Sequence, residues 1–310
     1  MNKVYLSLFI YLSFLFSSVI NNYNSIYFFA KSPTTNALSG IHFSSSNISE
    51  IFSQPISREK NIENNYYFSF TNQYNNQIEI IQFSYCINHT NKKNLSIGFI
   101  NRSISEIYNT NGAWNIENFL YPEFSDIDYS QISNLGYQDF GFVLSYNRFL
   151  KKADLSIKIK PFYNSLDSDK ALGLDLDLMS YYKLKGSNIS FVLGVNNFFS
   201  YKKWNNNTIE KNKKEYFLSS NINFDRLNVY FETNNIYNQE IAFEYRFQNS
   251  FYFRVGKGLE DFYTSGFGLN SNFIDLDYAY LNHNILGNTY QISLLFKLAS
   301  VESLSNKIGK

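Results

Sequence analysis

The chain has 310 residues, and its 27 Lys and Arg against 26 Asp and Glu give a formal net charge of +1. Proteins that bind nucleic acids carry an excess of clustered basic charge, and this chain has a net charge close to zero. We therefore expect no nucleic-acid partner. Aromatic residues make up 19% of the chain, which excludes a disordered protein. A mean hydropathy of −0.29 excludes a bundle of membrane-spanning helices.

Residues 1–25 are predicted to be an export signal. Lys3 precedes an uncharged apolar run, Val4–Ile20, and the small residues Ser17 and Ser18 lie near the end of this run. A basic start, an apolar stretch and small residues form the pattern of a secretory signal peptide. The alternative is a single membrane anchor, because the run is borderline in length for spanning a bilayer.

Beyond residue 64, apolar and polar side chains alternate with a period of two. From Leu172 to Leu178, for example, leucine occupies every second position, and Asp175 and Asp177 lie between the leucines. A period of two is that of a β-strand. The pattern predicts strands over residues 65–73, 77–87, 94–103, 139–149, 153–162, 171–182, 188–198, 215–224, 227–234, 239–247, 250–257, 262–269, 273–282 and 287–298.

The connections between these strands separate by length into two groups. Those after even-numbered strands are short, whereas those after odd-numbered strands include the long segments 104–138, 163–170 and 199–214. Short turns at one end and longer loops at the other are typical of an outer-membrane β-barrel, whose turns face the periplasm. We therefore predict an all-β fold: a transmembrane antiparallel up-and-down β-barrel over residues 65–298, in the bacterial outer membrane.

The polar faces of the strands are predicted to line the lumen of this barrel. Charged residues recur in the middle of strands, where a lipid-facing position would be costly, and aromatic residues crowd the opposite face. Only Glu79 and Arg148 carry charge on the apolar face, and both lie near strand ends. The lumen-lining candidates are Lys158, Lys160, Asp175, Asp177, Glu232, Glu244, Arg246, Arg254, Asp275 and Asp277.

Two Asp-x-Asp pairs in this set, 175/177 and 275/277, allow two interpretations. One is a cation site or an acid/base pair. The other, which we favour, is lumen polarity produced by the alternation itself and balanced by Lys and Arg across the lumen.

Residues 26–64 lack the alternation of the barrel. Small residues cluster over Thr34–Gly40, and Ile48–Phe52 is predicted to form a helical turn. This segment is either a plug inside the barrel or a periplasmic segment that caps its base. At the other end, residues 299–310 are predicted to form a polar tail.

Two segments resemble known outer-membrane families. Asn36–Gly40 and Ile51–Pro55 are similar to the opening of FadL-type and PorV/PorQ-type proteins, and Asp275–Tyr280 with Leu286–Ser293 resembles the last PorV/PorQ hairpin. The resemblance implies an outer-membrane barrel of the same strand number. The family includes components of type IX secretion that handle surface cargo, and relatives of fatty-acid importers. The final strand, Gln291–Leu298, resembles the signal read by the bacterial barrel-assembly machinery.

We expect no enzyme activity, no catalytic residue, no metal site and no cofactor. GxSxG, HExxH, Walker and Rossmann motifs are absent from the sequence. Cys86 is the one cysteine, and His42, His89 and His283 are too scattered to form a metal-ligand motif.

The long segment 104–138 contains an aromatic group that we treat as a surface-loop candidate. Loops of this length are often functional. We interpret the loop either as a recognition element or gate, or as a loop packed on the barrel rim. The aromatic residues in question are Trp114, Phe119, Tyr121 and Phe124.

The main functional prediction is a PorV/PorQ-like outer-membrane protein engaged in protein secretion or surface-cargo handling. One alternative is a FadL-like uptake channel for hydrophobic small molecules, which requires an apolar pocket near the loop end and a kinked strand or lateral opening. A second alternative is a soluble secreted β adhesin or structural protein. The expected partners are outer-membrane lipid, the barrel-assembly machinery, and either secreted cargo or a hydrophobic ligand.

Overall fold

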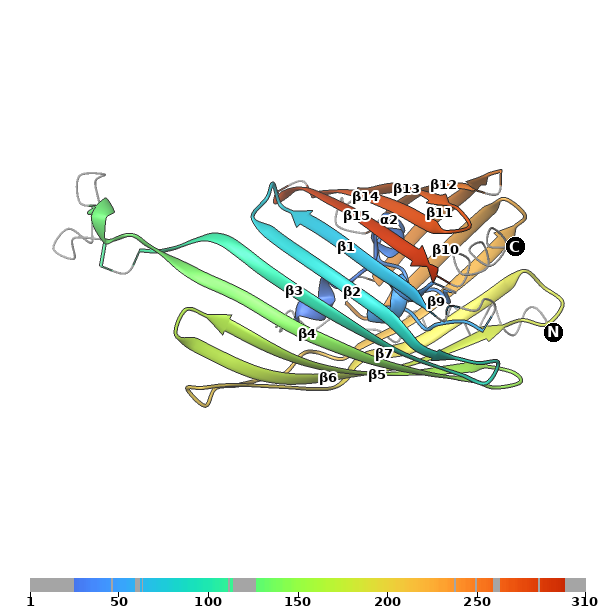
Figure 1. The fold of residues 1–310 in the computed structure, drawn as a ribbon, viewed down its shortest axis with the longest axis horizontal. Helices are drawn as coiled ribbons and strands as arrows, with labels where there is room; N and C mark the ends of the chain where they lie inside the picture. Colours follow the sequence, from blue (N-terminus) through green and yellow to red (C-terminus); the bar gives the residue numbers. More distant parts are fainter. Residues whose placement is uncertain are drawn as a thin grey trace, which may run out of the picture.

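The computed structural model describes residues 25–45, 47–58, 62, 64–110, 112–113, 127–236, 238–248, 250–258, 263–283 and 285–298. The predicted tail and, apart from Ser25, the predicted signal peptide lie outside these residues. Within them the chain forms one closed antiparallel barrel with short helices inside it (Figure 1). None of the helices in the described part of the chain has the length and apolar character needed to cross a membrane.

Fourteen long strands make up the wall, and the predicted up-and-down barrel is confirmed. They are β1 (Asn65–Gln73), β2 (Ile78–His89), β3 (Lys93–Asn109), β4 (Ser133–Phe149), β5 (Asp154–Leu166), β6 (Asp169–Lys183), β7 (Ile189–Trp204), β9 (Glu215–Phe224), β10 (Leu227–Asn234), β11 (Asn238–Phe247), β12 (Phe251–Lys257), β13 (Tyr263–Asn270), β14 (Ile274–His283) and β15 (Gly287–Lys297). The short β8 (Ile209–Glu210) pairs with β7 alone among the described strands.

Each long strand pairs with its neighbours along the chain, and β1 pairs with β15 to close the barrel. The register places like faces together: Phe68 lies opposite Phe83 of β2 and Leu294 of β15. The short turns and both ends of the barrel lie at one end, which is the periplasmic end of an outer-membrane barrel. We call it the turn end, and the opposite end the loop end.

The strands differ from their predicted bounds mainly at the loop end. β3 and β4 continue beyond the predicted strands and project as a hairpin past the rest of the wall, ending near the 3-10 helix η5 (Tyr129–Gln131) (Figure 1). The predicted long connection 163–170 is instead a tight turn at Asp167 and Ser168. The ends of β5 and β6 on either side of this turn are rich in polar residues. They therefore lack the alternation of apolar and polar side chains by which strands were predicted.

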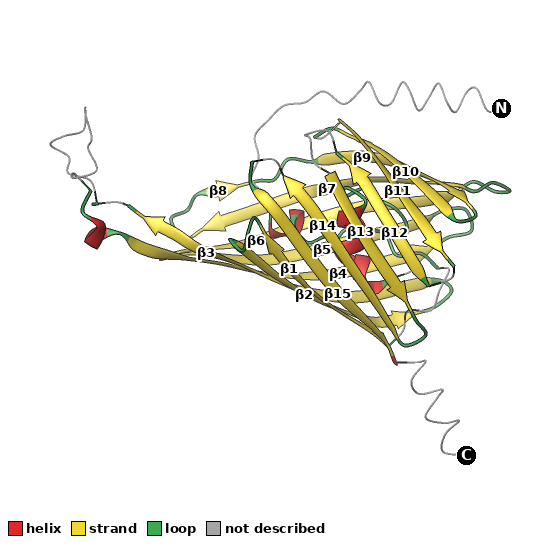
Figure 2. Cartoon of the chain, turned by 90° about the horizontal axis from the view of Figure 1, so that it is seen from above, coloured by secondary structure: helices red, strands yellow, loops and turns green. Residues whose placement is uncertain are grey.

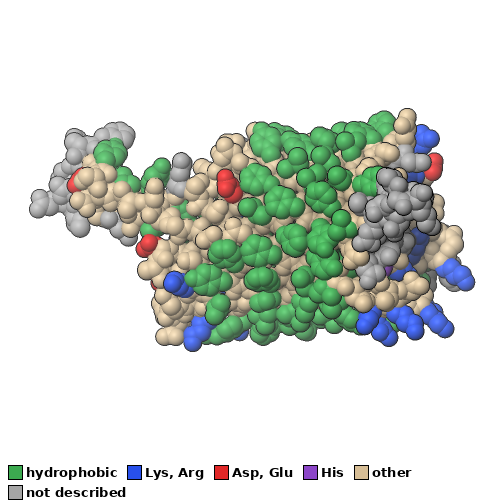
Figure 3. All heavy atoms as spheres, viewed as in Figure 1, with side chains coloured by type: hydrophobic (Ala, Val, Ile, Leu, Met, Phe, Trp, Pro, Cys, Tyr) green, Lys and Arg blue, Asp and Glu red, His purple; other side chains and the backbone are tan. Residues whose placement is uncertain are grey.

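The two faces of the wall have opposite chemistry. Large apolar side chains such as Leu172, which is 68% exposed, point outward, whereas polar side chains such as Gln82 and Asn147 are buried inside. Figure 3 shows the apolar side chains as a broad band across the face of the barrel in view. This inside-out arrangement suits hydrocarbon outside and a polar interior, so it excludes the soluble β protein considered above.

Residues 25–57, here called the plug, lie inside the barrel (Figure 2). They include η1 (Ile26–Phe28), α2 (Pro33–Ala37) and η2 (Ile48–Phe52). Ser32 caps α2 by accepting a hydrogen bond from the Thr35 N–H at 3.0 Å, with Pro33 in the first turn, where its missing N–H costs nothing.

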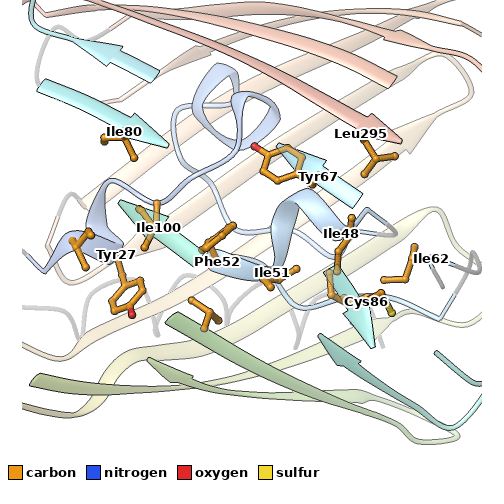
Figure 4. Packing of buried hydrophobic residues seen from close by; sticks show 14 of the residues in the cluster. Tyr27, Ile48, Ile51, Phe52, Ile62, Tyr67, Ile80, Cys86, Ile100 and Leu295 are labelled. Carbon is orange, nitrogen blue, oxygen red and sulfur yellow. The ribbon is translucent and has the colours of Figure 1, made fainter. Parts of the chain in front are cut away.

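An apolar cluster joins the plug to the wall. Ile48, Ile51 and Phe52 of η2 pack with Tyr67 of β1 and Ile100 of β3 (Figure 4). The plug also contacts the seam where the barrel closes. Gln291 of β15 donates to the Lys31 carbonyl at 2.8 Å and to the Ser69 hydroxyl at 3.1 Å, and accepts from the Asn36 amide at 2.6 Å.

Gly98 is expected to be essential for seating the plug. A Cβ at this position on β3 would lie 2.7 Å from the Phe52 ring and 3.0 Å from Ile51. Gly98→Val should therefore weaken plug docking by about 1–3 kcal/mol, the usual cost of overpacking. Limited proteolysis of the plug in the folded barrel would measure this as faster cleavage.

The matched control is Gly136→Val on the adjacent strand, because nothing lies within 4 Å of a Cβ at Gly136. Adding Phe52→Leu to Gly98→Val should restore protection of the plug in part. Equal cleavage of the two single variants would contradict this account.

Candidate functional site

The wall is interrupted in β7. Leu178 of β6 pairs with Val195, but Leu176 pairs with Phe199, so β7 has two residues more than β6 between these positions. The extra backbone is accommodated at Asn197, which has a φ of 54°. Asparagine tolerates this left-handed conformation better than most residues, so the local sequence permits the bulge.

The same interruption opens the other side of β7. Its pairing with β9 ends at Asn196 and Glu215, and backbone pairing resumes only at Lys202 and Glu210 of β8. We call the gap between these two pairs the window. A shorter break interrupts the β4–β5 ladder, where pairing stops at Gly141 and resumes at Leu144, and there the Tyr27 hydroxyl lies within hydrogen-bond distance of the Phe142 and Pro161 carbonyls.

Side-chain amides fill the window where backbone hydrogen bonds are missing. The Asn197 side chain donates to the Lys213 carbonyl at 3.3 Å, and its backbone N–H donates to Asp177 at 2.9 Å. The Asn196 side chain donates to Glu215 at 2.9 Å, and the Asn212 N–H donates to the Ser200 hydroxyl at 2.9 Å. The window is therefore closed by side-chain hydrogen bonds and not by a backbone ladder.

A cavity of about 70 Å³ lies between the window and the plug. Its wall side is formed by Asn196, Asn197, Asn212, Lys213 and Glu215. Its plug side carries aromatic rings and a cation; the residues that face it from there include Tyr27, Phe28, Lys31, His42 and Phe52. The cavity therefore combines apolar surface with basic groups.

His42 joins the plug to the edge of the window. Its Nδ1 lies 2.9 Å from the Glu232 carboxylate of β10, and its Nε2 lies 3.1 Å from the Asn196 amide of β7. Its ring stacks on Phe217 of β9, with centroids 3.7 Å apart and an angle of 12°. One plug residue thus contacts three strands, and its backbone N–H also donates to Glu232 at 2.8 Å.

The outer surface beside the window is apolar. Phe198 lies in the bulge of β7 and Phe199 directly follows it, and Ile209 and Tyr216 lie across the gap; all four are exposed. A hydrophobic molecule in the membrane would meet apolar side chains on both sides of the window. The window therefore connects the lipid-facing surface to the interior cavity.

A second, larger cavity of about 530 Å³ lies at the turn end of the lumen. It is lined mainly by polar and charged side chains, among them Arg254, which donates to Glu244 and to Asp277, both at 2.7 Å. Between the two cavities, plug residue Phe43 packs against Tyr230 of β10, with ring centroids 5.6 Å apart. The plug therefore separates the window from this periplasmic vestibule.

The lumen-lining candidates from the sequence are buried on the inner face, with one exception. Arg246 is partly exposed at the turn end, where its guanidinium donates to the Asp225 carbonyl at 3.2 Å, because it lies at the second-last position of β11. Their role in ligand passage stays a prediction. The buried ones are Lys158, Lys160, Asp175, Asp177, Glu232, Glu244, Arg254, Asp275 and Asp277.

The aspartate pairs are engaged by protein cations. Lys160 forms an ion pair with Asp177, and Lys297 forms one with Asp275. Among the described residues there is no group of three or more His, Cys, Asp or Glu side chains that could hold a metal ion. The surface-loop candidates Trp114, Phe119, Tyr121 and Phe124 lie outside the described residues.

Sequence reasoning missed the polar groups that organise the plug. Glu50 accepts hydrogen bonds from the Ser32 hydroxyl at 2.5 Å and the Thr35 hydroxyl at 2.7 Å. Burial raises the pKa of the Glu50 carboxyl, and these two donors partly oppose that rise. Arg102 was also missed: it pairs with Asp139 of β4 and lies over the Phe29 ring of the plug at 5.0 Å.

No protein-family model and no curated protein matches the chain. Its fold matches solved structures, among them the Ralstonia pickettii toluene transporter TbuX, at 10% identity over 85% of this chain and 96% of TbuX, with a TM-score of 0.54. The Pseudomonas putida toluene transporter TodX matches at 11% identity over 74% of this chain and 87% of its own, with a TM-score of 0.52.

A Pseudomonas aeruginosa FadL homologue matches at 9% identity over 86% of this chain and 98% of its own, with a TM-score of 0.51. At such identities the likeness shows a shared fold alone, that of a closed antiparallel β-barrel. The PorV/PorQ assignment made from the final hairpin is not confirmed by these comparisons.

Proposed function

We propose that this protein is an outer-membrane channel for the uptake of hydrophobic small molecules. The observation that carries the proposal is the window in β7, with exposed apolar side chains outside it and a partly aromatic cavity behind it. A molecule dissolved in the membrane or held at its outer surface would enter sideways through the wall. The shared fold with the toluene transporters TbuX and TodX supports this proposal.

The lining of the cavity indicates the chemistry of its ligand. Tyr27, Phe28 and Phe52 offer aromatic surface. Lys160 is ion-paired with Asp177. The two other lining lysines, Lys31 and Lys213, outnumber the one carboxylate among the described lining residues, Glu215. Aromatic rings favour an apolar body, and an excess of partly buried cations favours an anionic or strongly polar end. We therefore expect the preferred compounds to be amphipathic, with a compact apolar part and one acidic group.

The cavity is too small to hold such a ligand as it stands. Its volume of about 70 Å³ is about half of the ~150 Å³ that holds one benzene molecule in an engineered protein cavity. Passage to the vestibule therefore requires the plug to move. A channel of this type works by displacement of the plug rather than through a permanently open pore.

Deleting Asn197 and Phe198 tests the window. The deletion removes the two extra residues and preserves the alternation, so β7 should pair continuously with β6 and lose the bulge at which its pairing with β9 ends. We expect uptake of a radiolabelled aromatic acid or hydrocarbon by cells that express this variant to fall at least about tenfold, since its entry path is lost.

The matched control deletes Asn205 and Asn206 from the connection that follows β7 at the loop end. Heat-modifiable gel migration should show that both variants form barrels. Uptake at the level of the unaltered protein in the Asn197–Phe198 deletion, with the barrel intact, would reject lateral entry.

A further inference from the structure

The turn end of the barrel carries a one-sided concentration of lysine that the uptake function does not explain. Three turns, β2–β3, β4–β5 and β6–β7, each contain or adjoin two exposed lysines, and segments 90–93, 150–153 and 183–188 contain no acidic residue. We call these six residues the lysine rim. They are Lys92, Lys93, Lys151, Lys152, Lys183 and Lys185. Figure 3 shows basic side chains gathered at this end.

The strand register brings the three turns together. The strands from β2 to β7 pair in succession, so the turns are neighbours along one sector of the barrel edge. The Phe149 N–H donates to the Lys92 carbonyl at 2.8 Å, which ties the first turn to the second. The turns β11–β12 and β13–β14 on the opposite sector carry no charge at residues 248–250 and 271–273. The positive charge is therefore local and not a general property of this end.

Part of this charge faces the membrane. Lys93 and Arg148 are directly opposite each other in β3 and β4. Asn94 beside Lys93 and both neighbours of Arg148 are buried, so the two cations point outward from the wall. Like charges at directly opposed positions destabilise a sheet unless something neutralises them. An anion held between or beside them removes that cost.

The depth of these cations matches the lipid headgroup layer. Arg148 pairs across the strands with Leu155, which is exposed on the outer face, and exposed Tyr182 and Leu184 flank Lys183. The apolar band that meets hydrocarbon thus ends within one or two residues of the lysines. Cations at this level reach phosphate groups and not acyl chains.

On the lumen side of the rim, the same sector also has a hollow of about 220 Å³, which includes the buried residues Ser57 and Asp154. Four cations line it, and the one carboxylate among its described lining residues is Asp154, which is buried and ion-paired with Arg58. The lining cations are Arg58, Lys151, Lys152 and Lys183. Their charge therefore exceeds that of the carboxylate, and a phosphate group would balance it.

We propose that the lysine rim is a binding site for anionic phospholipids of the periplasmic leaflet, whose headgroup phosphates lie among these lysines while their acyl chains cover Leu155, Tyr182 and Leu184. The outward cation pair and the adjoining apolar side chains favour a lipid over a soluble anion, because a soluble anion would leave that apolar surface without a partner. The site is independent of the compound that the channel carries.

Native mass spectrometry of the full-length protein in detergent tests this site. The protein is incubated with equal amounts of phosphatidylglycerol and phosphatidylcholine that have identical acyl chains. Each lysine near an anionic lipid contributes about fivefold in affinity, so we expect at least about tenfold more bound phosphatidylglycerol. Changing four rim lysines to glutamine should abolish this preference: Lys151→Gln, Lys152→Gln, Lys183→Gln and Lys185→Gln.

The matched control neutralises four exposed lysines at the loop end and should keep the preference: Lys170→Gln, Lys203→Gln, Lys211→Gln and Lys257→Gln. Heat-modifiable migration verifies that both variants fold. Equal binding of the two lipids to the unaltered protein, or equal loss in both variants, would overturn the proposal. Full displacement of the lipid by inorganic phosphate at the same concentration would also overturn it, because it would reveal a site for free anions.

Discussion

Replacing His42 with alanine is expected to increase uptake of the hydrophobic probe by at least about tenfold. The substitution removes the contacts of the imidazole with Glu232, Asn196 and Phe217, which join the plug to three strands beside the window. Leaving a buried polar group without its hydrogen-bond partner costs about 1–3 kcal/mol. If the docked plug is destabilised relative to the displaced plug by only about 1.4 kcal/mol, the displaced population rises tenfold.

Two measurements should change together in this variant. Initial uptake rates should rise, and limited proteolysis should cleave the plug faster, because both depend on the displaced state. His283→Ala is the matched control, since His283 lies at the end of β14 and contacts the β14–β15 turn. An unchanged uptake rate in His42→Ala, with cleavage also unchanged, would show that His42 does not hold the plug.

A disulfide between plug and wall is expected to reduce uptake to the background of cells that lack the protein. The Ser39 and Thr264 hydroxyl oxygens lie 3.1 Å apart, so cysteines at these positions need little movement to reach the S–S bonding distance of about 2 Å. The pair Ser39→Cys with Thr264→Cys, in a Cys86→Ala background, should lock the end of α2 to β13. Passage would stop because the plug could no longer move.

The reducing agent provides the internal control for the tether. Uptake should return when dithiothreitol breaks the bond, and each single cysteine variant should transport normally under both conditions. Normal uptake by the oxidised double variant, with the cross-link shown by mass spectrometry, would mean that molecules pass without movement of α2. This result would leave lateral entry possible but exclude the displacement step.

The barrel was predictable because hydrocarbon imposes a strict requirement on each strand. A lipid-facing position must be apolar and its neighbours can be polar, so alternation marks every crossing, and the predicted bounds of β1, β9 and β10 equal those of the structure. Beyond the membrane this requirement disappears. For that reason the polar extensions of β3 and β4 were not predicted.

The site was much less visible in the sequence. The window has one local signal, the break in alternation where Asn196 and Asn197 precede Phe198 and Phe199, but a strand end would produce the same pattern. His42 and Glu50 belong to an irregular segment, where no period identifies which side chains are buried. Their roles depend on contacts with strands far away in sequence, which only the folded barrel brings together.

The hydrogen bonds of Gln291 have a consequence for the order of assembly. β15 is the last strand along the chain. The side-chain amide of its Gln291 nevertheless bonds to Lys31 and Asn36, near the start of the described chain, and to Ser69 of the first strand. A cylinder that sealed before the N-terminal segment had threaded into it would trap this amide without two of its partners, at about 1–3 kcal/mol for each unsatisfied group. Insertion of the N-terminal segment and pairing of β15 with β1 are therefore coupled. The folded barrel is favoured only when both are complete.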